Sequence, residues 1–226
     1  DLVQADEATQ ATNQFTVPDI PPEIAELMSP EDIARFRAGP GEEYMDAVRT
    51  RSLRGHAQGP ARWHPLMIRM GYDLQFVPLG GNSCEEGDFI FCFGPGAPAD
   101  PTECLAQQVG FGGTTIGDGK WLGTDIHSEY YPVFCLPDAA GYGEGYYEAE
   151  EGVLWLTATS TPHLVDDEGN KTFYINGTFV PTQSTGLFEG AFGWETAYVF
   201  TAEENDPAQN NGIGYSDAVI YGWVFF

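Results

Sequence analysis

Two neighbouring side chains, His127 and Glu129, have the types and spacing that acid–base chemistry needs. They are two positions apart, so a β-strand would place both on one face, where an imidazole and a carboxylate could exchange a proton. We therefore treat the pair as candidate catalytic residues lining a barrel. The alternative is that strand alternation alone places two polar side chains on a solvated face. The sequence assigns no further catalytic residue.

An acidic turn is a candidate cation site. Its possible oxygen ligands are Asp166, Asp167, Glu168 and Asn170. Carboxylate and amide oxygens suit Ca²⁺, but the segment is much shorter than the loop of about twelve residues in an EF-hand, and the same residue types are ordinary in turns. No nucleophile elbow or phosphate-binding loop is present, so calcium is the one cofactor suggested. Asn170 and Asn176 also begin glycosylation acceptor patterns, whose use stays open.

Four cysteines bear on the compartment rather than on catalysis: Cys84, Cys92, Cys104 and Cys135. Their spacing matches no common zinc-binding pattern, and no basic residue lies near them in the sequence to lower a thiol pKa. The even number favours two disulfides, and the simplest of the pairings joins Cys84 to Cys92 and Cys104 to Cys135. With the absence of an initiator methionine, this predicts a processed chain that is secreted or displayed at the cell surface.

The charge of the chain argues against several classes of partner. Its 226 residues include 9 Lys and Arg and 34 Asp and Glu, a formal net charge of −25 at pH 7. Nucleic acids and anionic membranes attract basic surfaces, so neither is expected here. No stretch approaches the roughly 20 apolar residues of a membrane-spanning helix. All the arginines lie between Arg35 and Arg69, which leaves the rest of the chain almost purely acidic. A salt-screened, solvated surface is the ordinary explanation, and a divalent-cation or cationic-partner surface is the alternative.

The elements that would position these residues are mostly strands. Tyr72, Leu74 and Phe76 alternate with polar neighbours, as in a half-buried strand. Further strands are expected at 88–93, within 121–134, at 143–149, 153–160 and 173–179, near 198–200 and at 215–226. Because turn residues rather than helices separate these strands, the pattern predicts a mainly β domain over 71–226, an antiparallel barrel or sandwich.

The first 70 residues have a different character. Prolines favour an extended N-terminal arm over 1–21, followed by a helical segment and linker over 22–70. Ser29 followed by Pro30 is typical of a helix start, and Gly39 followed by Pro40 of a helix end. A second short helix is expected from about residue 42 to 53, and 55–70 is interpreted as a connection.

A family resemblance is carried by the segment 184–193, Ser-Thr-Gly-Leu-Phe-Glu-Gly-Ala-Phe-Gly, within the strand–turn–strand stretch 172–200. Together with 119–127, the glycine-rich strand 143–149 and Leu-Trp-Leu-Thr-Ala-Thr at 154–159, it resembles the small β-barrels of the allene oxide cyclase and dirigent group and their secreted bacterial relatives. The resemblance spans roughly 71–226 and implies a calycin-like antiparallel barrel. Those proteins bind a hydrophobic substrate in the barrel mouth. Their catalytic residues have no position-by-position match here, so no catalytic role is carried over.

Two functional hypotheses follow. The favoured one is a secreted, acidic structural or interaction module, including a self-assembling surface or filament subunit. It is motivated by the N-terminal arm and the aromatic C-terminal strand, which could exchange with or pack on a neighbouring copy or another extracellular protein. The alternative is a barrel enzyme, a cyclase or isomerase, or a carrier of a small hydrophobic molecule. It requires a cavity inside the barrel, so an interior filled with side chains would exclude it.

Overall fold

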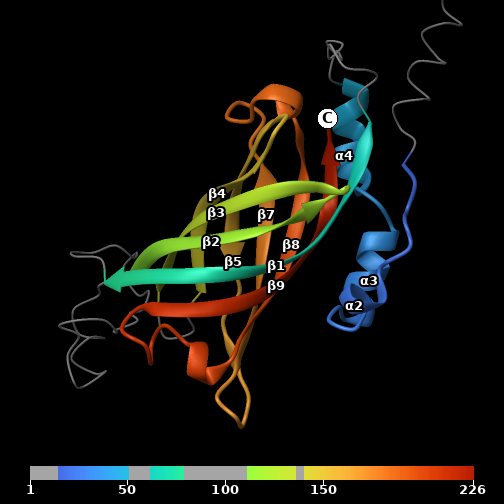
Figure 1. The fold of residues 1–226 in the computed structure, drawn as a ribbon. Helices are drawn as coiled ribbons and strands as arrows, with labels where there is room; N and C mark the ends of the chain where they lie inside the picture. Colours follow the sequence, from blue (N-terminus) through green and yellow to red (C-terminus); the bar gives the residue numbers. More distant parts are fainter. Residues whose placement is uncertain (1–14, 51–61, 79–110, 136–139) are drawn as a thin grey trace, which may run out of the picture.

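The computed structural model describes residues 15–50, 62–78, 111–135 and 140–226. Within these residues, eight strands form a closed antiparallel barrel, and the N-terminal helices lie against one side of its outer wall (Figure 1). The strands of the barrel are β1 (Trp63–Pro78), β2 (Phe111–Trp121), β3 (Thr124–Cys135), β4 (Ala140–Ala149), β5 (Gly152–Ser160), β7 (Lys171–Phe179), β8 (Phe192–Thr201) and β9 (Ile213–Phe225). A short strand β6 (Leu164–Val165) pairs with β7. The barrel expectation is thus confirmed.

The strands follow the order β5-β4-β3-β2-β1-β9-β8-β7, and the ring closes where β5 pairs with β7. Every neighbouring pair is antiparallel. The C-terminal strand β9 lies between β1 and β8 and pairs with both. Residues 217–225 of β9 therefore have a partner strand on both sides, and the β5–β7 pairing covers the outer edges of the sheet.

The N-terminal helices are α2 (Pro22–Ala25), α3 (Pro30–Arg37) and α4 (Glu42–Thr50). Helix α3 begins as expected, because the Ser29 side chain accepts a hydrogen bond from the backbone of Asp32 and the Asp32 carboxylate accepts one from the backbone of Ser29. Gly39 follows the end of α3 with φ +90°, a conformation that favours glycine. A Cβ atom there would also lie 2.3 Å from the ring of Phe15.

These helices cover an aromatic outer face on β8 and β9. Trp223, fully buried, contacts the rings of Phe15 and Phe36, with centroids 5.1 and 5.4 Å away, and its indole nitrogen donates to the Phe36 carbonyl. The indole nitrogen of Trp194 donates to the Pro40 carbonyl over 2.8 Å. Arg35 lies over the Trp194 ring at 4.3 Å. Most of the outward aromatic residues of β8 and β9 are therefore packed within the chain.

One end of the barrel interior is filled by its own side chains. The segment 184–193 turns into this end through the 3-10 helix η1 (Gly186–Phe188). The Phe188 ring stacks on Trp121 at 5.8 Å and contacts Phe226 at 5.0 Å. Gly186 has φ +62°, and a Cβ atom there would meet the Glu151 carbonyl at 2.2 Å. The stretch that carries the family resemblance thus acts as an internal plug.

Strand β2 was missed by the sequence interpretation because its inward positions are mostly glycine. A Cβ atom on Gly113 would lie 2.1 Å from the Phe76 ring, and one on Gly117 would lie 2.8 Å from the Met70 sulfur. The missing side chains leave room for the large residues of β1. A strand built this way lacks the apolar alternation on which recognition from sequence depends.

The connection expected at 55–70 is wrong for its second half, because β1 begins at Trp63. Leu66, Ile68 and Met70 face the barrel interior and are buried. The misleading residue was Pro65, which cannot donate a backbone hydrogen bond. Strand β2 pairs with β1 only from Gly71 onward, so at Pro65 the sole partner of β1 is β9. Pro65 therefore does not interrupt hydrogen bonding to a second strand.

Several expectations lie outside the described residues. They are the strand at 88–93, the first part of the N-terminal arm, and the side chains of Cys84, Cys92, Cys104 and Cys135, including their pairing. Cys135 ends β3, but only its backbone is described. Among the helices that are described, none has the length and apolar character needed to cross a membrane.

Candidate functional site

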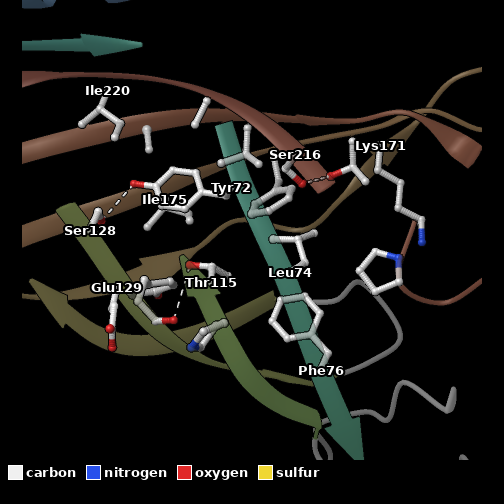
Figure 2. A pocket seen from close by; sticks show the side chains of 18 of the residues that line it. Tyr72, Leu74, Phe76, Thr115, Ser128, Glu129, Lys171, Ile175, Ser216 and Ile220 are labelled. Atoms are coloured by element: carbon white, nitrogen blue, oxygen red, sulfur yellow. Dashed lines mark hydrogen bonds between the residues drawn. The ribbon is translucent and has the colours of Figure 1, made fainter. Parts of the chain in front are cut away.

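A cavity of about 80 Å³ occupies the half of the barrel away from the plug. It lies among the second half of β1, the first half of β9 and the strands opposite them (Figure 2). Most of its wall is apolar, with Leu74, Phe76, Leu156, Phe173, Ile175 and Val199 among the lining side chains. An interior filled completely by side chains would have excluded a ligand-binding barrel, and this interior is not filled.

Glu195 is the acidic residue that strand β8 directs into the cavity. Its side chain shares the inward face with Ala197 and Val199, and the residue is only 3% exposed. Its neighbours in the register are glycines, Gly177 on β7 and Gly222 on β9. A Cβ atom on Gly177 would lie 2.7 Å from Cγ of Glu195. The glycine therefore makes room for the carboxylate inside the barrel.

Tyrosine hydroxyls surround this carboxylate. Tyr147 on β4 donates a hydrogen bond of 2.8 Å to Oε2 of Glu195. Tyr72 on β1 donates to the hydroxyl of Ser128 on β3 over 3.1 Å (Figure 2). Tyr130 and Tyr147 are buried and Tyr72 is partly buried. Burial is the main cause that raises the pKa values of all three, and the nearby charge of Glu195 raises them further.

The protonation of Glu195 is unusual for a carboxyl group. Burial raises the pKa of Glu195 from 4.5 to about 7, and the hydrogen bond from Tyr147 opposes this rise only in part. None of the ion pairs formed by the described residues includes Glu195. Glu195 can therefore gain and lose a proton near neutral pH, in an apolar cavity that disfavours its charge.

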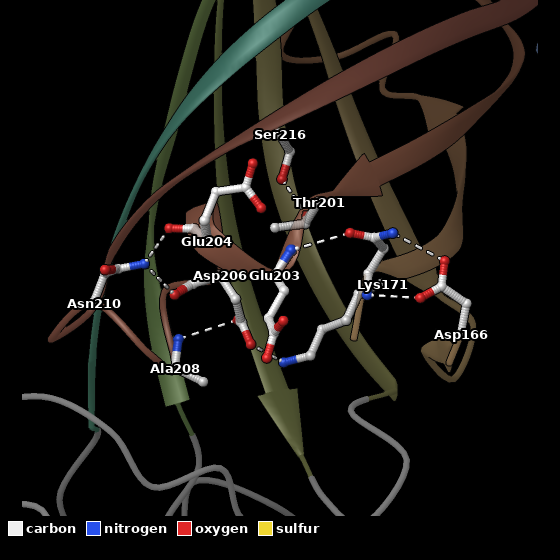
Figure 3. A network of polar contacts seen from close by, with 10 residues as sticks. Asp166, Lys171, Thr201, Glu203, Glu204, Asp206, Ala208, Asn210 and Ser216 are labelled. Atoms are coloured by element: carbon white, nitrogen blue, oxygen red, sulfur yellow. Dashed lines mark hydrogen bonds and ion pairs between the residues drawn. The ribbon is translucent and has the colours of Figure 1, made fainter. Parts of the chain in front are cut away.

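A polar network lies where the cavity approaches the ends of β7 and β8. Lys171 forms an ion pair with Asp206, and Thr201 hydrogen-bonds Ser216 (Figure 3). These four residues all line the cavity. The lysine and aspartate side chains are 16% and 6% exposed, so the pair is largely removed from solvent and tethers the β8–β9 connection to β7.

The pair predicted from the sequence lies on the other side of the wall. His127 and Glu129 share a face, as expected, with Nε2 and Oε1 3.3 Å apart, and Nδ1 of His127 lies 2.9 Å from Asp118. Inward positions of β3 are instead Ser128 and Tyr130. The expectation of a barrel-lining pair is therefore wrong. Glu129 forms part of the wall, but its carboxylate contacts His127 and Tyr131.

Hydrogen bonds account for the pKa shifts of this outer pair. The pKa of His127 is raised, mainly by its hydrogen bond to Asp118, and the pKa of Glu129 is lowered, mainly by the hydrogen bond from the Tyr131 hydroxyl. Both side chains thus favour their charged forms on an outer surface. The alternative stated for the sequence, two polar residues on a solvated face, describes this arrangement better.

The acidic turn at 166–170 is closed by its own hydrogen bonds. One oxygen of Asp166 accepts from the backbone of Glu168 and Asn170, each over 2.9 Å, and the other accepts from the Asn170 amide. These hydrogen bonds lower the pKa of Asp166, and the bond from the Asn170 side chain has the largest effect. Asp167 and Glu168 point to solvent as exposed residues. Across the described part of the chain, no three His, Cys, Asp or Glu side chains are grouped as a metal ion would need.

Glu195 itself was missed by the sequence interpretation, although a signal for it exists. It is the one acidic residue in the apolar strand Phe-Gly-Trp-Glu-Thr-Ala-Tyr-Val-Phe-Thr. Alternation places it on the same face as Ala197 and Val199. An acid on the apolar face of a strand is a candidate for a perturbed, functional carboxyl group.

Comparisons of the chain with protein-family models, curated proteins and solved structures find no match. Its architecture therefore defines its class: a closed, antiparallel, eight-stranded barrel, within the described residues, whose interior holds a cavity with a buried carboxyl group. Membership of the allene oxide cyclase and dirigent group stays a prediction from sequence resemblance.

Proposed function

We propose that this barrel binds a small, mostly apolar molecule in its cavity, with a polar group of that molecule at Glu195 and Tyr147. The observation that carries the proposal is the buried carboxyl group of Glu195 beside a space lined by apolar side chains. Burying a carboxyl group costs stability, and an apolar residue would fill a purely structural core better. A few convergent polar groups in an otherwise apolar cavity are typical of small-molecule sites.

Proton-transfer catalysis, as in a cyclase or isomerase, is the second candidate. It is favoured by the pKa of Glu195 near 7, which suits a general acid or base at neutral pH. Tyr147 stays protonated, because burial raises its pKa, and it can donate a hydrogen bond to developing negative charge. The sequence resemblance to the cyclase group supports the same proposal.

The structural-module hypothesis receives less support. The aromatic C-terminal strand pairs with β1 and β8 and is covered by helices, so it offers no edge for strand exchange. Arg35, one of the segregated arginines, docks on Trp194 and Thr196 of its own chain. Self-assembly, secretion and extracellular partners stay predictions that these observations do not test.

Calorimetric titration with the neutral probe 1-hexanol tests the proposed function. We expect binding to the wild type and a loss of at least about tenfold in Ala197→Leu, because the added side chain would occupy the cavity. Ala34→Leu, at an exposed position of helix α3, is the matched control and should bind as the wild type does. Unchanged binding in a folded Ala197→Leu variant, or no binding to the wild type, would argue against the proposal.

A further inference from the structure

We propose that the natural ligand of the cavity is an organic cation, an apolar molecule with one amine whose ammonium group pairs with the Glu195 carboxylate. This rests on the proposed function, that the cavity binds a small molecule, and adds the charge of that molecule. A primary, secondary or tertiary alkyl amine has the required chemistry. Three features of the cavity support it: its charge, its aromatic lining and its size.

The charges that face the cavity do not balance among themselves. In the described part of the chain, the charged residues that line it are Glu195, Lys171, Asp206 and Glu129. The Glu129 carboxylate is hydrogen-bonded to His127 and Tyr131 on the outer surface. Lys171 and Asp206 pair with each other, so the ionised Glu195 leaves one negative charge. The other titratable groups facing this space are His163, Tyr72 on β1, Tyr130 on β3 and Tyr147 on β4.

The geometry distinguishes a cation from other ligands. A bound anion would place a second negative charge beside Glu195 or require its protonation. A neutral ligand would leave an ionised Glu195 uncompensated or likewise require its protonation. A bound ammonium group can donate to the carboxylate and to tyrosine oxygens, as in a buried ion pair that is also hydrogen-bonded. The rings of Tyr72, Tyr130, Phe76 and Phe173 line the same space and can add cation–π attraction.

Two further properties fit this class of ligand. The chain carries a formal net charge of −25, which raises the local concentration of cations and speeds their association. The cavity volume of about 80 Å³ is smaller than the roughly 150 Å³ of an engineered cavity that accepts benzene. The ligand, or the part of it held inside the barrel, is therefore expected to be small.

Three probes of equal chain length test the inference: hexylamine, 1-hexanol and hexanoate. Calorimetric titrations at about pH 8.5 and about pH 5.5 bracket the pKa of Glu195 near 7. Alkyl amines resemble lysine, with a pKa of about 10.4, so hexylamine stays charged at both values. About 0.3 M salt screens association with the acidic outer surface. At the higher pH, we expect hexylamine to bind at least about tenfold more tightly than 1-hexanol, and hexanoate to bind most weakly.

The preference for hexylamine over 1-hexanol should shrink at the lower pH, because protonation removes the charge of Glu195. In Glu195→Gln the ratio of the two affinities should fall to about one at both pH values, whereas the exposed control Glu189→Gln should keep the wild-type ratio. A preference that is independent of pH, or that survives in Glu195→Gln, would overturn the inference. The pH comparison on the wild type decides the question even if Glu195→Gln does not fold.

The same titrations separate the two levels of the proposal. If 1-hexanol binds but hexylamine binds no more tightly at the higher pH, the inference about charge fails and the ligand-binding function stands. If none of the three probes binds, the proposed function fails, and the inference fails with it.

Discussion

Among the described residues, Glu195 is the acid inside the barrel whose pKa is strongly raised, and its surroundings explain how the fold tolerates it. Gly177 leaves space beside the side chain, and Tyr147 donates a hydrogen bond to it. The sequence pattern made the alternation of β8 predictable, but it did not predict that Glu195 would be a buried acid with a raised pKa. The environment of the carboxyl group depends on tyrosines from β1, β3 and β4. No local sequence pattern specifies that these strands lie near Glu195 inside the barrel.

Burial of Glu195 predicts a pH dependence of stability. Because its folded-state pKa is raised from 4.5 to about 7, folding favours the protonated form. The contribution of this group is therefore complete below about pH 4.5 and is lost as the pH rises through about 7. The loss reaches roughly 3 kcal/mol at most, taking about 1.4 kcal/mol per pKa unit. The Glu195→Gln variant should not show this loss of stability with rising pH.

Denaturant unfolding at about pH 5 and about pH 8 measures this difference, provided that both variants unfold in two states. Relative to the wild type, Glu195→Gln should gain stability at the higher pH. The surface variant Glu189→Gln should follow the wild type. If the free energies of unfolding of the wild type and Glu195→Gln change in parallel with pH, then Glu195 does not titrate in this range.

At the scale of elements, the sequence predicted those helices and strands whose ends and faces are determined by neighbouring residues in the chain. The capping residues of α3 and the alternation of β3 and β7 indicated those elements correctly. It failed for β2, where inward glycines replace side chains, and for the first half of β1, where Pro65 suggested a loop. In both cases the neighbouring strand supplies what the local sequence lacks: the large residues of β1 fill the space beside β2, and β9 supports β1 on one side.

The attachment of the helices to the barrel depends on Asp32. Besides capping α3, its carboxylate accepts a hydrogen bond of 2.6 Å from Tyr221 and one of 3.3 Å from Tyr174. Asp32→Ala should lower the free energy of unfolding by about 1–3 kcal/mol, because it removes the cap and leaves the fully buried Tyr221 without this acceptor.

Hydrogen exchange should locate the effect of Asp32→Ala at α3 and the adjoining part of β9 before the rest of the barrel. Glu31→Ala is the matched control, since Glu31 is an exposed acid in the same turn of α3. Equal effects of the two substitutions would show that Asp32 acts only through its charge at the helix start.

At the scale of the whole molecule, turn-separated strands were sufficient to predict a mainly β domain, a barrel or a sandwich, and the sequence resemblance favoured the barrel. They could not predict that one end is plugged by 184–193 while the other half holds a cavity. That outcome depends on the summed volumes of side chains from all eight barrel strands in the described part of the chain. The strongly acidic composition is evident from the sequence. It suggests a cationic ligand only together with the buried carboxylate that faces a space inside the barrel.

A crystal structure of the protein grown with 1-hexanol tests the central claim most directly. We predict electron density for one molecule inside the barrel, with its hydroxyl group within hydrogen-bonding distance of Glu195 or Tyr147 and its chain along the wall that includes Phe173 and Val199. At a concentration that saturates the calorimetric titration, an empty cavity or a probe bound only on the outer surface would contradict the account.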